Sequence, residues 1–478
     1  MLVVGVHGAT SIRPEAGFDG AAHVDYADVL EREDRLPVEE ESYEFHSPPL
    51  FHWIAVRAQG WVDRVGGTAE AIAGGAFDVS ARAGWLAIAA ILALLALMSR
   101  RRGRLWLATL VLAGGALLWL GAALVATATE TRWSAGQLLS VLWTCGLVAV
   151  AWLLGRLLWP GRADLPLIVA LGTFAIPIVP RLGTMFHPEM QFAFLAAAAI
   201  LVFLRAHASG WPLGHGVALG ALLGLAALTR QTAVVVILGL GIAAFLLGRA
   251  AAWRFAATTA ALVLLLAGPW WFHQFDRHGN PIQSNLDREG YLLEGGQPRS
   301  FYVSFPVRDL VVHPYRPSFQ NELLPQFHAD LWSDWFGGQH GFWGDASRSA
   351  RFFASTQSVL GVFAAVVALA GLVGVGLPAV VAAARGRRLG AGEAVFATFL
   401  VLAILTWAAF VVTLIRFPQA EGDPIKSSYM LYLTPALVVA AVAFVERLWR
   451  KGTAWQAAAL AWSALYAVSY AGFLATSW

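Results

Sequence analysis

Charged residues are scarce in this chain of 478 amino acids. Asp, Glu, Lys and Arg make up 13% of it, and hydrophobic residues make up 58%. Soluble globular proteins carry about 25% charged residues, so this composition excludes an ordinary soluble enzyme. The net charge of +3 is small for a chain of this length, and we expect no nucleic-acid partner.

Cysteine is almost absent as well. Cys145 is the single cysteine, so the chain forms no disulfide within itself and gives no indication of its redox compartment. Because Cys145 lies inside an apolar run, we interpret it as a small buried side chain.

What the chain has instead is long stretches without charge. A helix crosses a hydrocarbon core of about 30 Å with about 20 apolar residues. The sequence therefore predicts an all-α polytopic protein that crosses a lipid bilayer with about twelve spans. Two of them, 165–180 and 190–204, are short enough to be tilted or re-entrant. The predicted spans are residues 84–99, 104–126, 135–158, 165–180, 190–204, 213–229, 231–248, 255–273, 357–383, 394–415, 428–445 and 455–475.

The short loops alternate in their content of Lys and Arg. One set of loops holds fifteen of these residues and the opposite set holds five. By the positive-inside rule, the richer set faces the cytoplasm. This orientation places both hydrophilic stretches, residues 13–82 and 274–352, outside the plasma (inner) membrane. The richer loops contain "SRRRGR" (99–104), "GRLLWPGR" (155–162), Arg205, Arg249 with Arg254, "ARGRRLG" (384–390) and "ERLWRKG" (446–452).

These features divide the chain into four parts. Residues 1–82 form an N-terminal segment and first outer loop with juxtamembrane helices, and transmembrane helices follow over 83–273. Residues 353–478 hold the C-terminal transmembrane helices. The stretch between them, 274–352, is rich in aromatic residues, which disordered linkers lack, so we predict an ordered extracytoplasmic cap there. The alternative is a loop that only covers helix ends.

The start of the chain has too few apolar residues for a spanning helix. "MLVVGV" offers six, without a preceding basic residue, whereas a signal-peptide core needs about 7 to 15. Because the next segment is predicted outside, we expect that a thirteenth spanning helix belongs before it and that "MLVVGV" forms its last turns. The alternative is that the following hairpin carries this short tail across.

Residues 15–44 hold eleven of the thirty acidic residues of the chain. The pattern predicts a helix from about Asp19, whose carboxylate we expect to cap its first turn. His23 and Tyr26 follow at spacings of four and seven, which places them on the same helix face as Asp19. We expect Pro37 to end this helix and a second, amphipathic one to begin near Leu50 and lie along the membrane interface.

Asp19 differs from the other acids of this segment. It lies between Phe18 and small residues, a setting in which a carboxylate acquires a raised pKa and acts as a general base. Six other acids belong to charge runs, and we predict a solvated outer face for them. These are Glu31, Glu33, Asp34, Glu39, Glu40 and Glu41.

The segment as a whole resembles the first extracytoplasmic loop of GT-C glycosyltransferases, such as the protein O-mannosyltransferases and lipid A aminoarabinose transferases. The resemblance rests on an acid followed by "AAHVDYADVLEREDRLP" and then "FHSPPLFHW". The family usually has a pair of acids where this chain has Asp19 and Gly20, so a partner acid is Asp25, Asp28 or neither. Similar elements follow in the family's order: "GTMFHPEMQFAFLAAAAILVFLRA" (183–206), "LTRQTAVVV" (228–236), "GPWWFHQFDRHGNPI" (268–282) and "KSSYMLYLTPALVV" (426–439).

The resemblance implies a GT-C-type multispanning bundle that carries out a defined reaction. A hydroxyl of a lipid, glycan or protein acceptor attacks a polyprenyl-phosphate-linked sugar with inversion, on the outer side of the membrane. Asp19 would be the base, and no cofactor would be required. Cations would stabilise the departing phosphate. The implied substrate-binding residues are His23, Tyr26, His46, Arg181, His187, Arg230, Lys426 and Tyr429.

Three alternatives accompany this interpretation. Some GT-C relatives use a divalent cation, for which Asp19 and Asp25 are the candidate ligands, although neither "HVD" nor "HPE" has the spacing of a zinc motif. A transporter or flippase for a lipid-linked sugar is a second possibility, but no inverted repeat is visible. An O-antigen-ligase-like enzyme is the third, and its key residues are expected in the late outer loop.

Overall fold

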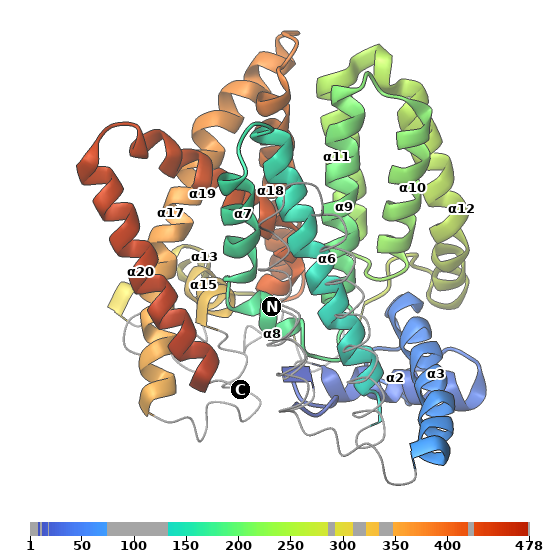
Figure 1. Cartoon of the computed structure of the whole chain (residues 1–478). Helices are drawn as coiled ribbons and strands as arrows, with labels where there is room; N and C mark the ends of the chain where they lie inside the picture. Colours follow the sequence, from blue (N-terminus) through green and yellow to red (C-terminus); the bar gives the residue numbers. More distant parts are fainter. Residues whose placement is uncertain are drawn as a thin grey trace.

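The computed structural model describes residues 8–9, 12–17, 19–73, 132–284, 292–308, 322–333, 348–418 and 425–476. Over these residues the architecture is all-helical, without a β-sheet. Long helices stand side by side in a bundle, and shorter helices gather at one end of it (Figure 1). The residues of "MLVVGV" and the spans predicted at 84–99 and 104–126 lie outside the described residues.

The structure corrects the predicted number of spans. Of the ten predicted spans that fall in the described part of the chain, seven are helices long and apolar enough to cross a membrane. Three further apolar helices have only 10 to 17 residues: α7 (Asp164–Phe174), α10 (Leu213–Ala227) and α11 (Ala233–Gly248). The seven long ones are α6 (Ser134–Leu158), α9 (Glu189–Ala208), α12 (Trp253–His278), α17 (Arg348–Ala384), α18 (Ala391–Arg416), the continuous pair η2 (Ser427–Leu433) and α19 (Thr434–Trp449), and α20 (Thr453–Thr476).

The two spans predicted to be short differ from each other. Residues 165–180 do not form one helix, because α7 ends at Phe174 and α8 (Ile178–Leu182) follows separately. Pro177 explains the break, since it lacks a backbone N–H and disfavours a helical conformation at Ile176. Residues 190–204 belong to α9, a full-length helix of 20 residues, so the expectation of a short span there was wrong.

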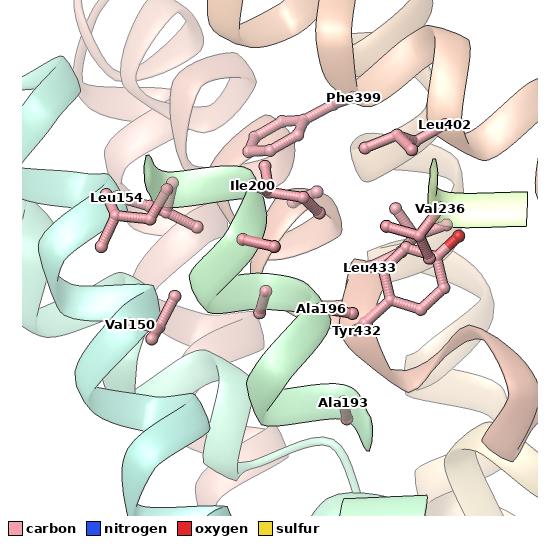
Figure 2. Close-up of a cluster of buried hydrophobic side chains, with 14 of the residues drawn as sticks. Val150, Leu154, Ala193, Ala196, Ile200, Val236, Phe399, Leu402, Tyr432 and Leu433 are labelled. Carbon is pink, nitrogen blue, oxygen red and sulfur yellow. The ribbon is translucent and has the colours of Figure 1, made fainter. Parts of the chain in front are cut away.

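Helix α9 forms the centre of the bundle. Of its apolar 18-residue window 72% is buried, the largest share among the seven long helices. Small side chains such as Ala193 and Ala196 let α6 and η2 approach it closely, and Ile200 lies near Phe399 of α18 (Figure 2). Its first turn therefore has a fixed position at the end of the bundle where the shorter helices lie.

Two of the helices at that end come from the N-terminal segment 1–82. Helices α2 (Gly20–Glu33) and α3 (Leu50–Ala73) confirm the two helices predicted there. They lie at one end of the bundle, near the start of α6 (Figure 1). A small apolar cluster holds them in place. Its members are Val24, Ala27, Phe51, Ala55, Trp133 and Phe186.

Several local expectations were wrong. The side chain of Asp19 does not cap α2, because Asp19 has a left-handed backbone (φ 51°) and its carboxylate points elsewhere. Helix α2 ends at Glu33, before Pro37, with Asp34 in a left-handed conformation that breaks the helix. Cys145 is partly exposed on α6 and not buried.

The solvated acids were predicted well. Glu33, Asp34, Glu39 and Glu40 are exposed. Glu31 and Glu41 are partly exposed, because each carboxylate pairs with an arginine, Arg132 and Arg35 respectively.

The predicted outer stretch 274–352 is shorter at both edges than expected. Helix α12 continues to His278, and α17 begins at Arg348. Between them lie α13 (Arg299–Val303) and α15 (Leu323–Ser333). Most residues of α15 are buried, so this part of the stretch is packed against the bundle.

Candidate functional site

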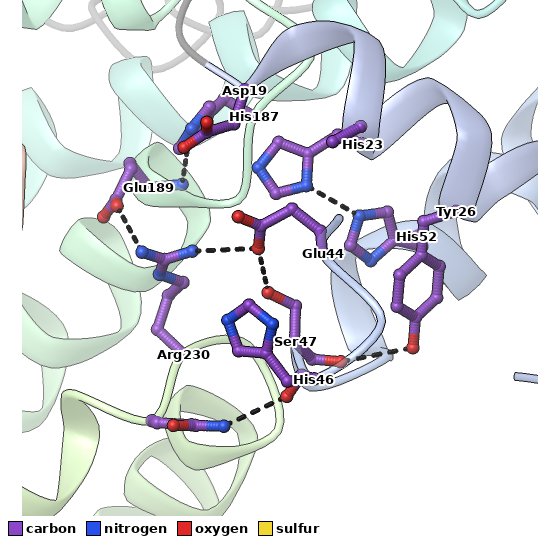
Figure 3. A network of polar contacts seen from close by, with 12 residues as sticks. Asp19, His23, Tyr26, Glu44, His46, Ser47, His52, His187, Glu189 and Arg230 are labelled. Carbon is purple, nitrogen blue, oxygen red and sulfur yellow. Dashed lines mark hydrogen bonds and ion pairs between the residues drawn. The ribbon is translucent and has the colours of Figure 1, made fainter. Parts of the chain in front are cut away.

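Polar side chains from three distant parts of the chain meet at the end of the bundle where α2 and α3 lie. Residues 19–52 supply one part, and the start of α9 and the turn between α10 and α11 supply the second (Figure 3). The start of η2 supplies the third. We name this group the polar cluster. It consists of Asp19, His23, Tyr26, Glu44, His46, Ser47, His52, His187, Glu189, Arg230, Lys426 and Tyr429.

Arg230 is at the middle of the polar cluster. Its Nη2 atom lies 3.0 Å from Oε1 of Glu189, and its Nη1 atom lies 3.9 Å from Oε2 of Glu44. The guanidinium also lies over the ring of Tyr429, 5.7 Å from its centroid. Since the side chains of Glu44 and Glu189 are 6% and 1% exposed, the arginine neutralises two carboxylates that have little access to water.

Asp19 and Lys426 form a second ion pair. Lys426 Nζ donates to Asp19 Oδ2 at 3.0 Å, across 407 positions of sequence. The left-handed backbone of Asp19, which Asp tolerates better than most residues, turns the carboxylate toward Lys426. The side chain of Asp19 is 24% exposed, so this carboxylate remains open to water at one side, whereas that of Lys426 is 10% exposed.

The histidines form a stacked group beside these ion pairs. Nδ1 of His23 lies 3.1 Å from Nε2 of His52, and the ring of Tyr26 stacks on His52 with centroids 3.9 Å apart. His187 contacts His23 edge to face at 4.6 Å. The hydroxyl of Tyr26 donates to the backbone carbonyl of Ser47. The group is therefore held rigidly by ring packing and by hydrogen bonds.

Burial keeps these histidines neutral at pH 7. It lowers the pKa of His23 from 6.5 to about 4, since removal from water disfavours the imidazolium form. The pKa values of His46, His52 and His187 are also lowered by burial. Neutral imidazoles donate and accept hydrogen bonds without adding positive charge.

Glu44 is ionised although it is buried, whereas the buried histidines are neutral. Burial opposes ionisation of its carboxyl group, but His23 and His46, which are protonated at low pH, and Arg230 favour it. The hydroxyl of Ser47 also donates to Glu44. Together these groups lower the pKa of Glu44, so it is a carboxylate at neutral pH.

The buried histidines predict a loss of stability in acid. The folded-state pKa of His23, about 4, lies below its unfolded value of 6.5, so the unfolded chain binds more protons between these pH values. The contribution of His23 to the free energy of unfolding is complete above pH 6.5 and falls by about 3 kcal/mol as the pH drops to 4. We expect the melting temperature to fall steeply over this interval and less steeply in His23→Gln.

The control for this measurement is His215→Gln, a partly exposed histidine on α10. It should leave the pH dependence of the melting temperature close to that of the native protein. Equal slopes for His23→Gln and the native protein between pH 6.5 and 4 would contradict the assignment of this dependence to His23.

The structure brings most of the predicted site residues together. Arg181 is buried on α8, and the contacts that define the polar cluster are made by other residues. Of the possible partner acids, Asp25 is exposed on α2, and Asp28 accepts a hydrogen bond at 2.9 Å from the indole of Trp133. The predicted residues that lie in the polar cluster are Asp19, His23, Tyr26, His46, His187, Arg230, Lys426 and Tyr429.

Four residues of the polar cluster were not predicted as site residues: Glu44, Ser47, His52 and Glu189. The signal for Glu44 was its position between Tyr43 and Phe45, outside the run of consecutive acids. Glu189 follows His187 at the start of an apolar span, where a carboxylate is expensive without a partner.

No group of three or more His, Cys, Asp or Glu side chains among the described residues has an arrangement that would hold a metal ion. Comparison with protein families, curated proteins and solved structures yields no match for this chain. Fold and site together define a multi-pass integral membrane protein with a buried polar cluster at one end of its helical bundle.

Proposed function

We propose that this protein is a membrane glycosyltransferase. It moves a sugar from a polyprenyl-phosphate donor to an acceptor hydroxyl on a lipid, glycan or protein. The observation that carries the proposal is the contact between Asp19 and Lys426, which pairs a partly exposed carboxylate with a cation inside the polar cluster. Transfer to a hydroxyl with a phosphate leaving group requires a base for the acceptor and a cation for the departing phosphate.

In the proposed reaction Asp19 accepts the proton of the acceptor hydroxyl. The acceptor oxygen forms a bond to the anomeric carbon, the bond from that carbon to the phosphate oxygen breaks, and the electron pair leaves with the polyprenyl phosphate. Attack from the opposite face inverts the configuration. Lys426 holds the carboxylate of Asp19 in place before the reaction.

The two cations have different roles in this proposal. Arg230 already faces Glu44 and Glu189, so a phosphate must compete with both carboxylates for it. Lys426 pairs with Asp19, and Asp19 becomes neutral when it takes the proton. Lys426 is therefore the main phosphate ligand in this proposal, and Arg230 supplies additional positive charge.

The test is a transfer assay with purified protein, a short-chain polyprenyl-phospho-sugar and candidate acceptors. A new glycosidic product together with free polyprenyl phosphate supports the proposal. Movement of the intact donor across vesicle membranes without bond cleavage would contradict it and favour a flippase. The glycolipids that accumulate in a deletion strain would identify the donor sugar.

We also propose that the polar cluster faces the outside of the plasma membrane, as the charges of the loops predict. Single cysteines at Glu40 and Val303 should react with a membrane-impermeant thiol reagent in intact cells, in a Cys145→Ser background. Both positions are exposed, whereas Ser42 is buried and unsuitable as a reporter. Arg388→Cys, in the opposite loop, should react only after lysis, and labelling of Arg388→Cys in intact cells would reverse the orientation.

A further inference from the structure

A buried carboxylate lies next to the polar cluster without being part of it. Asp330 belongs to α15 and is 0% exposed. Its Oδ2 atom accepts two hydrogen bonds from Ser427, from the backbone N–H at 2.6 Å and from the hydroxyl at 2.7 Å. Ser427 is also fully buried, and it is the first residue of η2.

The helix that carries Asp330 is firmly attached to the bundle. The ring Nε2 of His328 lies 2.9 Å from the backbone carbonyl of Ser358 on α17. Trp332 packs against Gly361 so closely that a Cβ at that glycine would meet the indole at 2.4 Å. Asp330 is thus presented to Ser427 from a fixed helix.

The residue before Ser427 is Lys426. Its backbone is extended (φ −129°, ψ 118°), and its side chain reaches Asp19. The other end of η2 is held by the hydroxyls of Tyr432 and Thr406, which contact each other. The hydrogen bonds of Asp330 therefore fix the end of η2 from which Lys426 extends.

We propose that Asp330 is a positioning residue that holds Lys426 against Asp19. A carboxyl group suits this role because one of its oxygens accepts both the N–H and the O–H of Ser427. The catalytic meaning of this role rests on the proposed function, whereas the placement of Lys426 does not.

The lysine content of the chain offers a direct test. The chain has two lysines, Lys426 and Lys451, and Lys451 is exposed. Acetylation of the solubilised full-length protein with an N-hydroxysuccinimide ester, followed by mass spectrometry, gives the labelling of Lys426 relative to Lys451. In the native protein Lys426 should be protected. Asp330→Ala should raise the ratio roughly tenfold, and Asp330→Asn, which keeps one acceptor oxygen, should raise it less.

The matched control is Ser333→Ala on the same helix. It removes the hydrogen bond from that hydroxyl to the backbone carbonyl of Ala329, within α15, and should leave the ratio of Lys426 to Lys451 labelling unchanged. All variants are labelled below their melting temperatures. A native ratio in Asp330→Ala, or an equal rise in Ser333→Ala, would overturn the proposal.

The transfer assay separates this inference from the proposed function. If Asp330 positions Lys426 for catalysis, the value of kcat should fall as the labelling ratio rises, from Asp330→Asn to Asp330→Ala. The KM for the acceptor should stay near its native value. A raised labelling ratio in a protein that transfers no sugar would support the placement of Lys426 and contradict the glycosyltransferase proposal.

Discussion

Asp19→Asn is expected to lower the turnover of sugar transfer by a factor of about 10² to 10⁴, the range that general-base catalysis contributes. Asparagine has nearly the shape of aspartate but accepts no proton from the attacking hydroxyl. The amide oxygen of asparagine still accepts a hydrogen bond from Lys426 Nζ, so the substitution should cost little stability. The measurement is kcat on purified protein, with the melting temperature and detergent-solubilised yield as checks on folding.

The control for Asp19→Asn is Asp25→Asn on the same helix. Asp25 is exposed on α2, and its replacement should leave kcat unchanged. The same pair of variants tests the metal alternative, because carboxylates that share a divalent cation would both lose activity and would respond to a chelator. Native turnover in Asp19→Asn would remove Asp19 from the mechanism.

The sequence predicted where the helices of this protein lie better than which of them are long enough to cross a membrane. Long apolar runs bounded by charged loops located helices such as α6 and α18 to within a few residues. In the described part of the chain the number of helices long enough to cross a membrane was overestimated, since α7 and α10 end earlier, and α11 begins later, than the predicted spans. Their ends depend on turns such as the one at Pro177 and on tertiary contacts that a hydropathy pattern does not contain.

Asp19 and Glu44 illustrate the same limit within the site. The small residues around Asp19 distinguished it from the other acids, and this local signal was enough to select it. Its actual partner, Lys426, is 407 positions away, so the expectation of a helix cap assigned the carboxylate to the wrong neighbour. Glu44 was not selected as a site residue, because its partner Arg230 is also remote in sequence.

Arg230→Met is expected to destabilise the folded protein by about 3 to 5 kcal/mol, the cost of breaking a buried ion pair from one side. Methionine preserves much of the side-chain volume, so the effect reports charge and not a cavity. Glu44 and Glu189 would both remain buried without this arginine. The measurement is the melting temperature, with Arg254→Met as a control, since Arg254 is exposed on α12 and should change stability by less than about 0.5 kcal/mol.

A second substitution identifies the cause of that loss. Glu189→Gln in the Arg230→Met background removes one of the two stranded carboxylates, so the double variant should be more stable than Arg230→Met alone. Equal stability of Arg230→Met and the native protein, or no recovery in the double variant, would contradict the role of Arg230 as the counter-ion of Glu189.

The double variant also separates the effect of Arg230 on folding from its effect on donor binding. If Arg230 supplies positive charge to the donor phosphate, the recovered protein should still bind a non-hydrolysable donor more weakly than the native protein, whereas acceptor affinity should be unchanged.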